Sequence, residues 1–127
     1  MLDTNAVIAY REGILEVCTL IEGAEMLFLP VIVLGELLYG ALNSAQPEKN
    51  KQDIYKFLEY SVLVPIDEAI AVRYSTIRLS LKRTGNPIPE NDLWIAAMAI
   101  EFDMPLLTRD THFDYVQGLK VINWVRK

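Results

Sequence analysis

The sequence contains a single cysteine, Cys18, and a single histidine, His112, among its 127 residues. One cysteine cannot form a disulfide within the chain, and a lone thiol suits a reducing compartment, so we expect a cytoplasmic protein. One cysteine and one histidine are also too few for the zinc sites that Cys and His build in structural domains. A bound metal ion is therefore expected to have oxygen ligands.

Long apolar runs are missing as well. No stretch reaches the roughly 18 residues that span a bilayer, and no basic segment followed by an apolar one opens the chain as an export signal would. We therefore expect no membrane partner. The composition, with 52% hydrophobic and 23% charged residues, is that of a folded globular protein. Because the length suffices for one core, residues 1–127 are predicted to form a single domain.

Positive charge is scarce, since 12 Lys and Arg residues stand against 17 Asp and Glu residues and give a net charge of −5. Nucleic-acid binders usually present a basic surface to the phosphates. A cluster of carboxylates that holds divalent cations, however, has its local charge reversed. The net charge therefore neither supports nor excludes a nucleic-acid partner.

Short apolar runs alternate with segments of helical spacing along the chain. Strands are predicted at residues 26–33, with a break or an end near Pro30, and at residues 62–64, 105–108 and 119–124. Helical segments are predicted from about residue 6, at 34–41, 47–60, 67–85 and 93–100, and as a short turn at 112–116. Strands that alternate with helices predict an α/β fold, here a three-layer α/β/α sandwich around a mainly parallel sheet.

Four acidic residues lie at the ends of predicted strands or the starts of predicted helices, in four separate segments: Asp3, Glu36, Asp92 and Asp110. In open α/β sheets such positions collect at one edge, beyond the carboxyl ends of the strands. Two carboxylates about 4 Å apart repel each other by about 4 kcal/mol at an effective dielectric constant near 20. A Mg²⁺ or Mn²⁺ ion makes this crowding favourable, because hard cations prefer carboxylate oxygens. Asn5 and Thr108 add polar groups near the first and the last of these acids.

Each acid also has an ordinary structural interpretation. Asp commonly caps a helix or lies in its first turn, and Glu on a helix often faces solvent. Asp67 illustrates the alternative, because it follows a predicted strand as well and is interpreted only as an N-cap. Glu90, at the entrance to the apolar helix, is interpreted as a residue that starts this helix, with membership of the acidic cluster as the alternative.

Four segments resemble a known family: "LDTNAVIAY" at the start, "VLGELLYG" at 33–40, "IPENDLWIAAMAI" at 88–100 and "PLLTRDTHF" at 105–113. In this order and spacing they resemble PIN domains over essentially the whole chain, and in particular the VapC-type toxins of bacterial and archaeal toxin–antitoxin pairs. One departure concerns the first strand, because only Met1 and Leu2 precede Asp3 where PIN domains have several apolar residues. That strand is therefore either frayed or begins upstream.

The resemblance implies a metal-dependent endoribonuclease. It places the catalytic and metal-binding acids, which hold one or two Mg²⁺ ions or Mn²⁺ as a substitute, on Asp3, Glu36, Asp92 and Asp110, with Asn5 and Thr108 in support. The ions activate water for hydrolysis of an RNA phosphodiester bond. Candidates for holding the substrate are Arg109, Arg11 and His112, each of which is equally accounted for as an ordinary surface side chain.

The resemblance also implies two partners, an RNA substrate and a cognate antitoxin protein. A mean hydropathy of +0.21 is high for a small monomer and predicts apolar surface that a partner covers. One arrangement is a groove between segments 34–38 and 54–58 that receives an amphipathic antitoxin segment, and another is a homodimer.

Two other functions stay open. The first is a PIN-fold interaction module without catalysis, which the presence of all four acids argues against. The second is another Mg-dependent phosphohydrolase, such as a haloacid-dehalogenase-like phosphatase. Those enzymes carry Asp-x-Asp after the first strand, whereas the second position here is Asn5.

Overall fold

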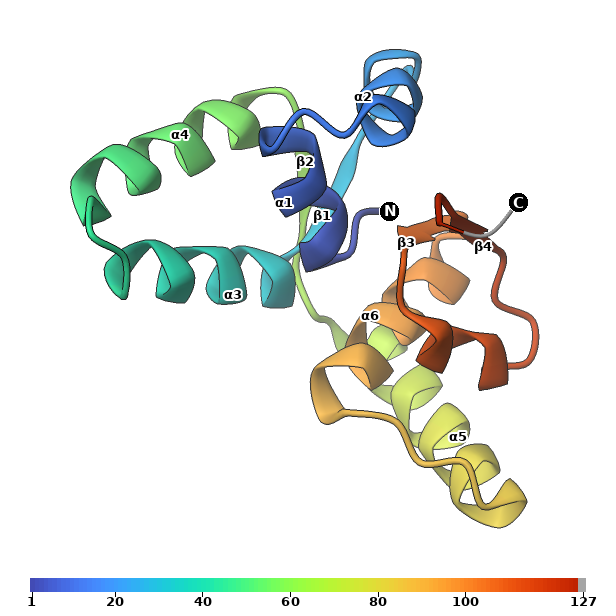
Figure 1. The fold of residues 1–127 in the computed structure, drawn as a ribbon. Coiled ribbons are helices and arrows are strands. Elements are labelled where there is room, and N and C mark those ends of the chain that lie inside the picture. Colours follow the sequence, from blue (N-terminus) through green and yellow to red (C-terminus); the bar gives the residue numbers. More distant parts are fainter. Residues whose placement is uncertain (126–127) are drawn as a thin grey trace.

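A computed structural model describes residues 1–125 as helices packed around short parallel strands (Figure 1). The first half of the chain comprises α1 (Thr4–Arg11), α2 (Leu15–Glu22), β1 (Phe28–Pro30), α3 (Val31–Leu42), α4 (Pro47–Glu59) and β2 (Val62–Val64). The second half comprises α5 (Glu68–Thr84), α6 (Glu90–Glu101), β3 (Leu106–Thr108), the 3-10 helix η1 (Thr111–Tyr115) and β4 (Val121–Asn123). The predicted α/β class is confirmed, although α2 was not predicted.

The strands form two parallel pairs that the N-terminal residues join. β1 pairs with β2, and β3 pairs with β4, each over three residues. Between the pairs, Leu2 forms a parallel bridge to Leu107, and its N–H donates a 2.9 Å hydrogen bond to the carbonyl of Phe28. Met1 and Leu2 are both buried. The short first segment is therefore held on both sides and is not frayed.

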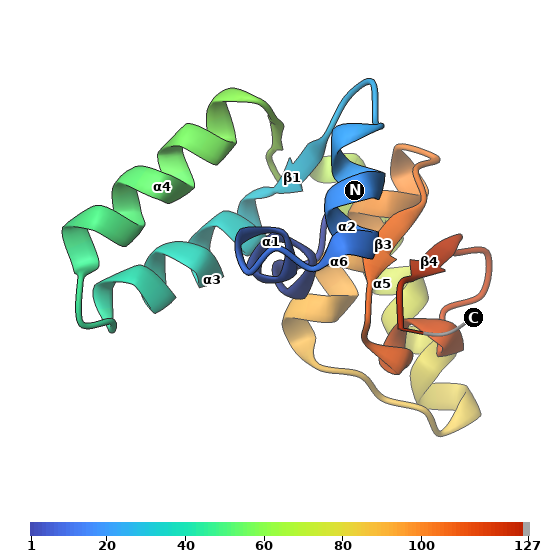
Figure 2. The ribbon, with the colours of Figure 1, turned by 45° about the horizontal axis from the view of Figure 1, so that its top comes forward.

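Helices cover both sides of the strands. Figure 2 shows α1 and α2 on the near side and α5 on the far side, while α3 and α4 extend outward as a helical hairpin. α6 packs against α5 and also contacts α3, and its Leu93 and residues 95–99 are buried. This agrees with the predicted three-layer arrangement and with an apolar helix in the interior. None of the helices in residues 1–125 combines the length and apolarity that a bilayer crossing requires.

The strand ends at Pro30, which is one of the two predicted alternatives, and the assignment of residues 31–33 to the strand is wrong. Pro30 is the N-cap of α3, and the β-branched residues after it form the first helical turn. The helix buries Val33, Leu37 and Ala41, which are four residues apart. Burying a valine or leucine side chain such as Val33 or Leu37 contributes about 1.5–3 kcal/mol, whereas β-branched residues disfavour a helix by only about 0.5 kcal/mol each. Packing therefore overrides local propensity, and it places Glu36 in the second turn of α3.

The predicted boundaries of α5 are confirmed. Asp67 is the N-cap, and its carboxylate accepts a 3.0 Å hydrogen bond from the N–H of Ile70. Gly85 closes the helix in the left-handed region at a φ of 76°, which glycine adopts without strain. Asp67 is thus a structural acid.

Candidate active site

The four predicted acids lie around one pocket of about 440 Å³. They come from distant parts of the chain: the end of the N-terminal segment, the second turn of α3, the first turn of α6, and the loop after β3. The lining consists of Asp3, Thr4, Asn5, Glu36, Pro89, Glu90, Asn91, Asp92 and Asp110. The predicted convergence at the carboxyl ends of the strands is therefore found.

Asp3 both caps α1 and faces the pocket. One carboxylate oxygen accepts a 2.8 Å hydrogen bond from the N–H of Thr4, and the other accepts a 2.7 Å bond from the hydroxyl of Thr108. The residue is only 4% exposed. Burial raises the pKa of Asp3 above its ordinary value, and the charge of Asp110 adds to this, although both hydrogen bonds act in the opposite direction. Asp3 therefore caps α1 and lines the acidic pocket at the same time.

Thr4 is a site residue that the sequence interpretation missed. Its hydroxyl donates a 3.1 Å hydrogen bond to Oε1 of Glu36, while its backbone N–H binds Asp3. Burial raises the pKa of Glu36, the bond from Thr4 lowers it, and the charge of Asp3 raises it further. Thr4 lies between Asp3 and Asn5 in the segment "LDTNAVIAY", and this position is the sequence feature that could have identified it as a site residue.

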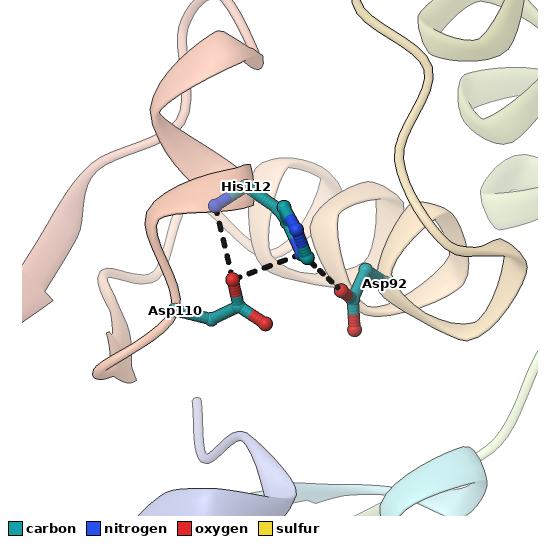
Figure 3. A group of neighbouring side chains, drawn as sticks. All are labelled: Asp92, Asp110 and His112. Carbon is teal, nitrogen blue, oxygen red and sulfur yellow. Dashed lines mark hydrogen bonds and ion pairs between the residues drawn. The ribbon is translucent and has the colours of Figure 1, made fainter.

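Asp92, Asp110 and His112 lie next to one another, with the ring of His112 directed at both carboxylates (Figure 3). Nδ1 of His112 lies 2.9 Å from Oδ1 of Asp110 and 3.5 Å from Oδ2 of Asp92. Burial, followed by the charges of Asp3 and Asp110, raises the pKa of Asp92 to about 6, and His112 opposes that rise. The carboxylates are therefore close enough to disfavour simultaneous ionisation.

The supporting residues lie where they were expected. Thr108 is fully buried, and besides its bond to Asp3 it accepts a 2.9 Å hydrogen bond from the N–H of Asp110. Asn5 is exposed on the lining of the pocket. Thr108 thus braces two of the acids, and Asn5 adds a side chain that solvent and a ligand can reach.

Two of the predicted substrate-binding residues differ in position. Arg109 is exposed and adjoins Asp110. Arg11 instead lines a separate pocket of about 640 Å³, where its guanidinium lies 3.6 Å from the carboxylate of Asp53. Arg109 is thus next to a pocket acid in the chain without being part of the pocket lining, and Arg11 belongs to a different pocket.

Glu90 lies on the pocket lining and is the first residue of α6. Its carboxylate accepts a hydrogen bond from the hydroxyl of Tyr74 and lies 3.5 Å from the guanidinium of Arg78. The ring of Tyr74 stacks on Trp94 with the centroids 3.8 Å apart. The carboxylate of Glu90 is therefore paired with two side chains of α5, Tyr74 and Arg78, which agrees with its interpretation as a structural residue.

The donor set matches a hard divalent cation. Carboxylate oxygens are the ligands that Mg²⁺ and Mn²⁺ prefer. Burial, and after it the charges of neighbouring carboxylates, raise the pKa values of Asp3, Glu36 and Asp92. A cation among these groups would relieve the crowding. The arrangement thus fits a metal-binding acidic site.

Comparison with known proteins places this site in a family. The PIN domain model matches residues 1–119. Ribonuclease VapC2 of Haemophilus influenzae is 33% identical over 128 aligned positions, which cover 98% of this chain and 97% of that protein. The tRNA(fMet)-specific endonuclease VapC of Shigella flexneri is 34% identical over 94 positions, which cover 73% of this chain and 71% of that protein.

The solved structures agree. A chain in the crystal structure of VapBC2 from Rickettsia felis bound to a DNA fragment from its promoter superimposes with a TM-score of 0.89 and 29% identity, covering 98% of this chain and 97% of that one. The family match, the relatives and the pocket with four acids lead to the same conclusion. The chain belongs to the PIN domain family, as the resemblance of its four segments indicated.

Proposed function

We propose that this chain is a metal-dependent endoribonuclease and the toxin component of a toxin–antitoxin module. The observation that carries the proposal is the convergence of Asp3, Glu36, Asp92 and Asp110 on one pocket of a PIN domain. The full-length relative from Haemophilus influenzae is named a ribonuclease, which supports the same chemistry.

Asp3, Asp92 and Asp110 would hold one or two Mg²⁺ or Mn²⁺ ions, and Glu36 would ligate an ion or orient the attacking water. The divalent cation supplies Lewis-acid stabilisation of the phosphate and makes a water nucleophilic near neutral pH. Thr108 and Thr4 keep the carboxylates in place through their hydrogen bonds to Asp3 and Glu36. Such fixed positioning contributes much of the acceleration in phosphoryl transfer.

The RNA presents an unpaired segment to the pocket, because nucleotides held in a duplex cannot bring their backbone into a recessed site. Asn5 is exposed on the pocket lining, and Arg109, the exposed cation that precedes Asp110 in the chain, is the candidate for contacting the RNA phosphates. The relative from Shigella flexneri is named a tRNA(fMet)-specific endonuclease, which supports a loop of a structured RNA as the substrate class.

The protein partner is an antitoxin, and the solved VapBC complexes support this assignment. An open pocket of about 640 Å³ between α1, α2 and α4 offers apolar side chains to an amphipathic segment, including Ile8, Tyr10, Leu27 and Phe57. It differs from the groove expected between segments 34–38 and 54–58, because α3 contributes no residue to its lining. Exposed apolar residues on α3, Tyr39 and Leu42, are 70% and 66% exposed and are available to a second copy in a homodimer. Size-exclusion chromatography of the chain, with and without a co-expressed antitoxin, distinguishes a homodimer from a complex that forms only with the antitoxin.

Cleavage of total RNA by the purified chain, with Mg²⁺ and with EDTA, tests the proposal. We expect cleavage only with metal, and we expect Asp3→Asn and Asp92→Asn to abolish it while the circular dichroism spectrum is retained. Asp67→Asn is the matched control, because Asn also serves as an N-cap and Asp67 caps α5 outside the pocket. Full activity in either site variant, or equal loss in the control, contradicts the proposal.

A further inference from the structure

His112 places the chain's only imidazole between two acids of the site. Its Nδ1 approaches Oδ1 of Asp110 to 2.9 Å and Oδ2 of Asp92 to 3.5 Å, as Figure 3 shows. One ligand atom from each of these three residues lies within 4.8 Å of the other two. Two oxygens and one nitrogen are thus gathered from α6 and from the segment after β3.

These separations suit neighbouring ligands of one cation. Bonds of about 2.1 Å to an octahedral ion place adjacent ligand atoms about 3 Å apart, and a somewhat wider ligand angle extends this to about 3.5 Å. The two distances from Nδ1, 2.9 and 3.5 Å, fall in that interval. The side chain is also 48% exposed, so that exchange of water around an ion is not blocked.

The backbone fixes His112 independently of its ring. The N–H of His112 donates a 3.0 Å hydrogen bond to Oδ1 of Asp110, which is the N-cap of η1. Phe113, the next residue, is fully buried and anchors the turn. The backbone bond and the buried Phe113 therefore hold the turn without the ring, and the ring nitrogen Nδ1 faces the two carboxylates.

We propose that Nδ1 of His112 is a direct ligand of the divalent cation held by Asp92 and Asp110, and that it makes the site prefer Mn²⁺ to Mg²⁺. The inference rests on the proposed function, since it assumes that the acidic pocket binds metal. The imidazole acts as the neutral tautomer that carries its proton on Nε2 and offers the Nδ1 lone pair. Nitrogen ligands favour transition metals, whereas Mg²⁺ favours oxygen.

Pulsed electron paramagnetic resonance of Mn²⁺ bound to the untagged protein tests the contact directly. Because the chain has one histidine, any nitrogen coupling typical of a coordinated imidazole comes from His112. We expect this coupling in the wild-type protein and its loss in His112→Ala. If Mn²⁺ binds without the coupling, His112 is not a ligand, and the nuclease proposal stands. If no Mn²⁺ binds, the assignment of His112 as a ligand and the metal-dependent nuclease proposal are both contradicted.

Calorimetric titrations with Mn²⁺ and with Mg²⁺ test the preference. In His112→Ala we expect a loss of about tenfold in Mn²⁺ affinity and a loss of less than about threefold for Mg²⁺. His112→Asn, whose amide oxygen takes roughly the place of Nδ1, should recover part of the Mn²⁺ affinity without the nitrogen coupling. Equal losses for the two metals, or no loss for either, overturn the preference.

Discussion

The hydroxyl of Thr108 donates a 2.7 Å hydrogen bond to Oδ2 of Asp3 and accepts a 2.9 Å bond from the N–H of Asp110. Thr108 is fully buried, so water does not compete for either bond. A single side chain on β3 thereby connects two acids from opposite ends of the sequence. Their spacing depends on this hydroxyl.

Thr108→Val removes the hydroxyl and keeps the shape of the side chain. We expect the free energy of unfolding to fall by about 1–3 kcal/mol, because two buried polar groups lose a partner. RNA cleavage should fall as well, since Asp3 is no longer held. Urea unfolding measures the first effect. Thr108→Ser retains the hydroxyl and serves as the control, and equal stability of the two variants would show that the bond is unimportant.

Asp92→Asn should stabilise the metal-free protein. Burial and the charges of Asp3 and Asp110 disfavour the ionised form of Asp92 and raise its pKa to about 6. Removing that charge relieves a penalty on the order of 1 kcal/mol after allowance for solvent screening. Thermal unfolding at pH 8 in EDTA measures the gain. Addition of Mn²⁺ should raise the melting temperature of the wild-type protein but not that of the variant.

The raised pKa of Asp92 also predicts that the stability of the fold depends on pH. Because the pKa of Asp92 is about 6 in the folded protein against an ordinary value of 3.8, the folded state binds more protons than the unfolded state between these pH values. The contribution of Asp92 to stability is therefore fully present below pH 3.8 and is lost as the pH rises through 6.

Metal affinity should show the opposite trend, because a proton and a cation compete for the carboxylate. We expect Mn²⁺ affinity to increase by up to about tenfold per pH unit below pH 6 and to level off above it. Calorimetry between pH 5 and pH 8 checks this, and an affinity independent of pH would exclude Asp92 as a ligand.

Arg109 and Arg11 should differ in their effects on RNA. Arg109 is exposed and directly precedes Asp110 in the chain, so Arg109→Ala should reduce the slope of log affinity against log salt by about one. Arg11 is paired with Asp53 in another pocket, and Arg11→Ala should leave that slope unchanged. Fluorescence anisotropy with a labelled RNA oligonucleotide measures both slopes. A loss in Arg11→Ala that equals the loss in Arg109→Ala would place the RNA elsewhere.

Asp67→Ala should destabilise the fold and spare the site. Loss of the hydrogen bond from the N–H of Ile70 to the cap should cost about 1 kcal/mol. Mn²⁺ affinity should stay the same, because Asp67 does not line the acidic pocket. Denaturant titration and calorimetry on one preparation test both expectations, and a weakened Mn²⁺ affinity would contradict the division between structural and site acids.

Elements with strong local signals were predicted well. The charged amphipathic helix now seen at Pro47–Glu59, the cap residues Asp67 and Gly85, and the buried helix that begins at Glu90 follow from periodicity and capping chemistry. The start of α3 was not predicted, because the β-branched residues after Pro30 favour a strand locally and only the burial of Val33, Leu37 and Ala41 makes them helical.

The identity of the four acids was determined by the sequence alone: Asp3 and Asp110 precede helical segments at the ends of apolar runs, and Glu36 and Asp92 lie near the starts of predicted helices. In open α/β folds such positions collect at one edge of the sheet. Tertiary structure decided how these acids are held and which neighbours join them. The bonds from Thr4 to Glu36 and from Thr108 to Asp3, the commitment of Glu90 to Tyr74 and the approach of His112 to Asp92 all join distant segments. Such contacts depend on packing distances, which no local pattern in the chain encodes.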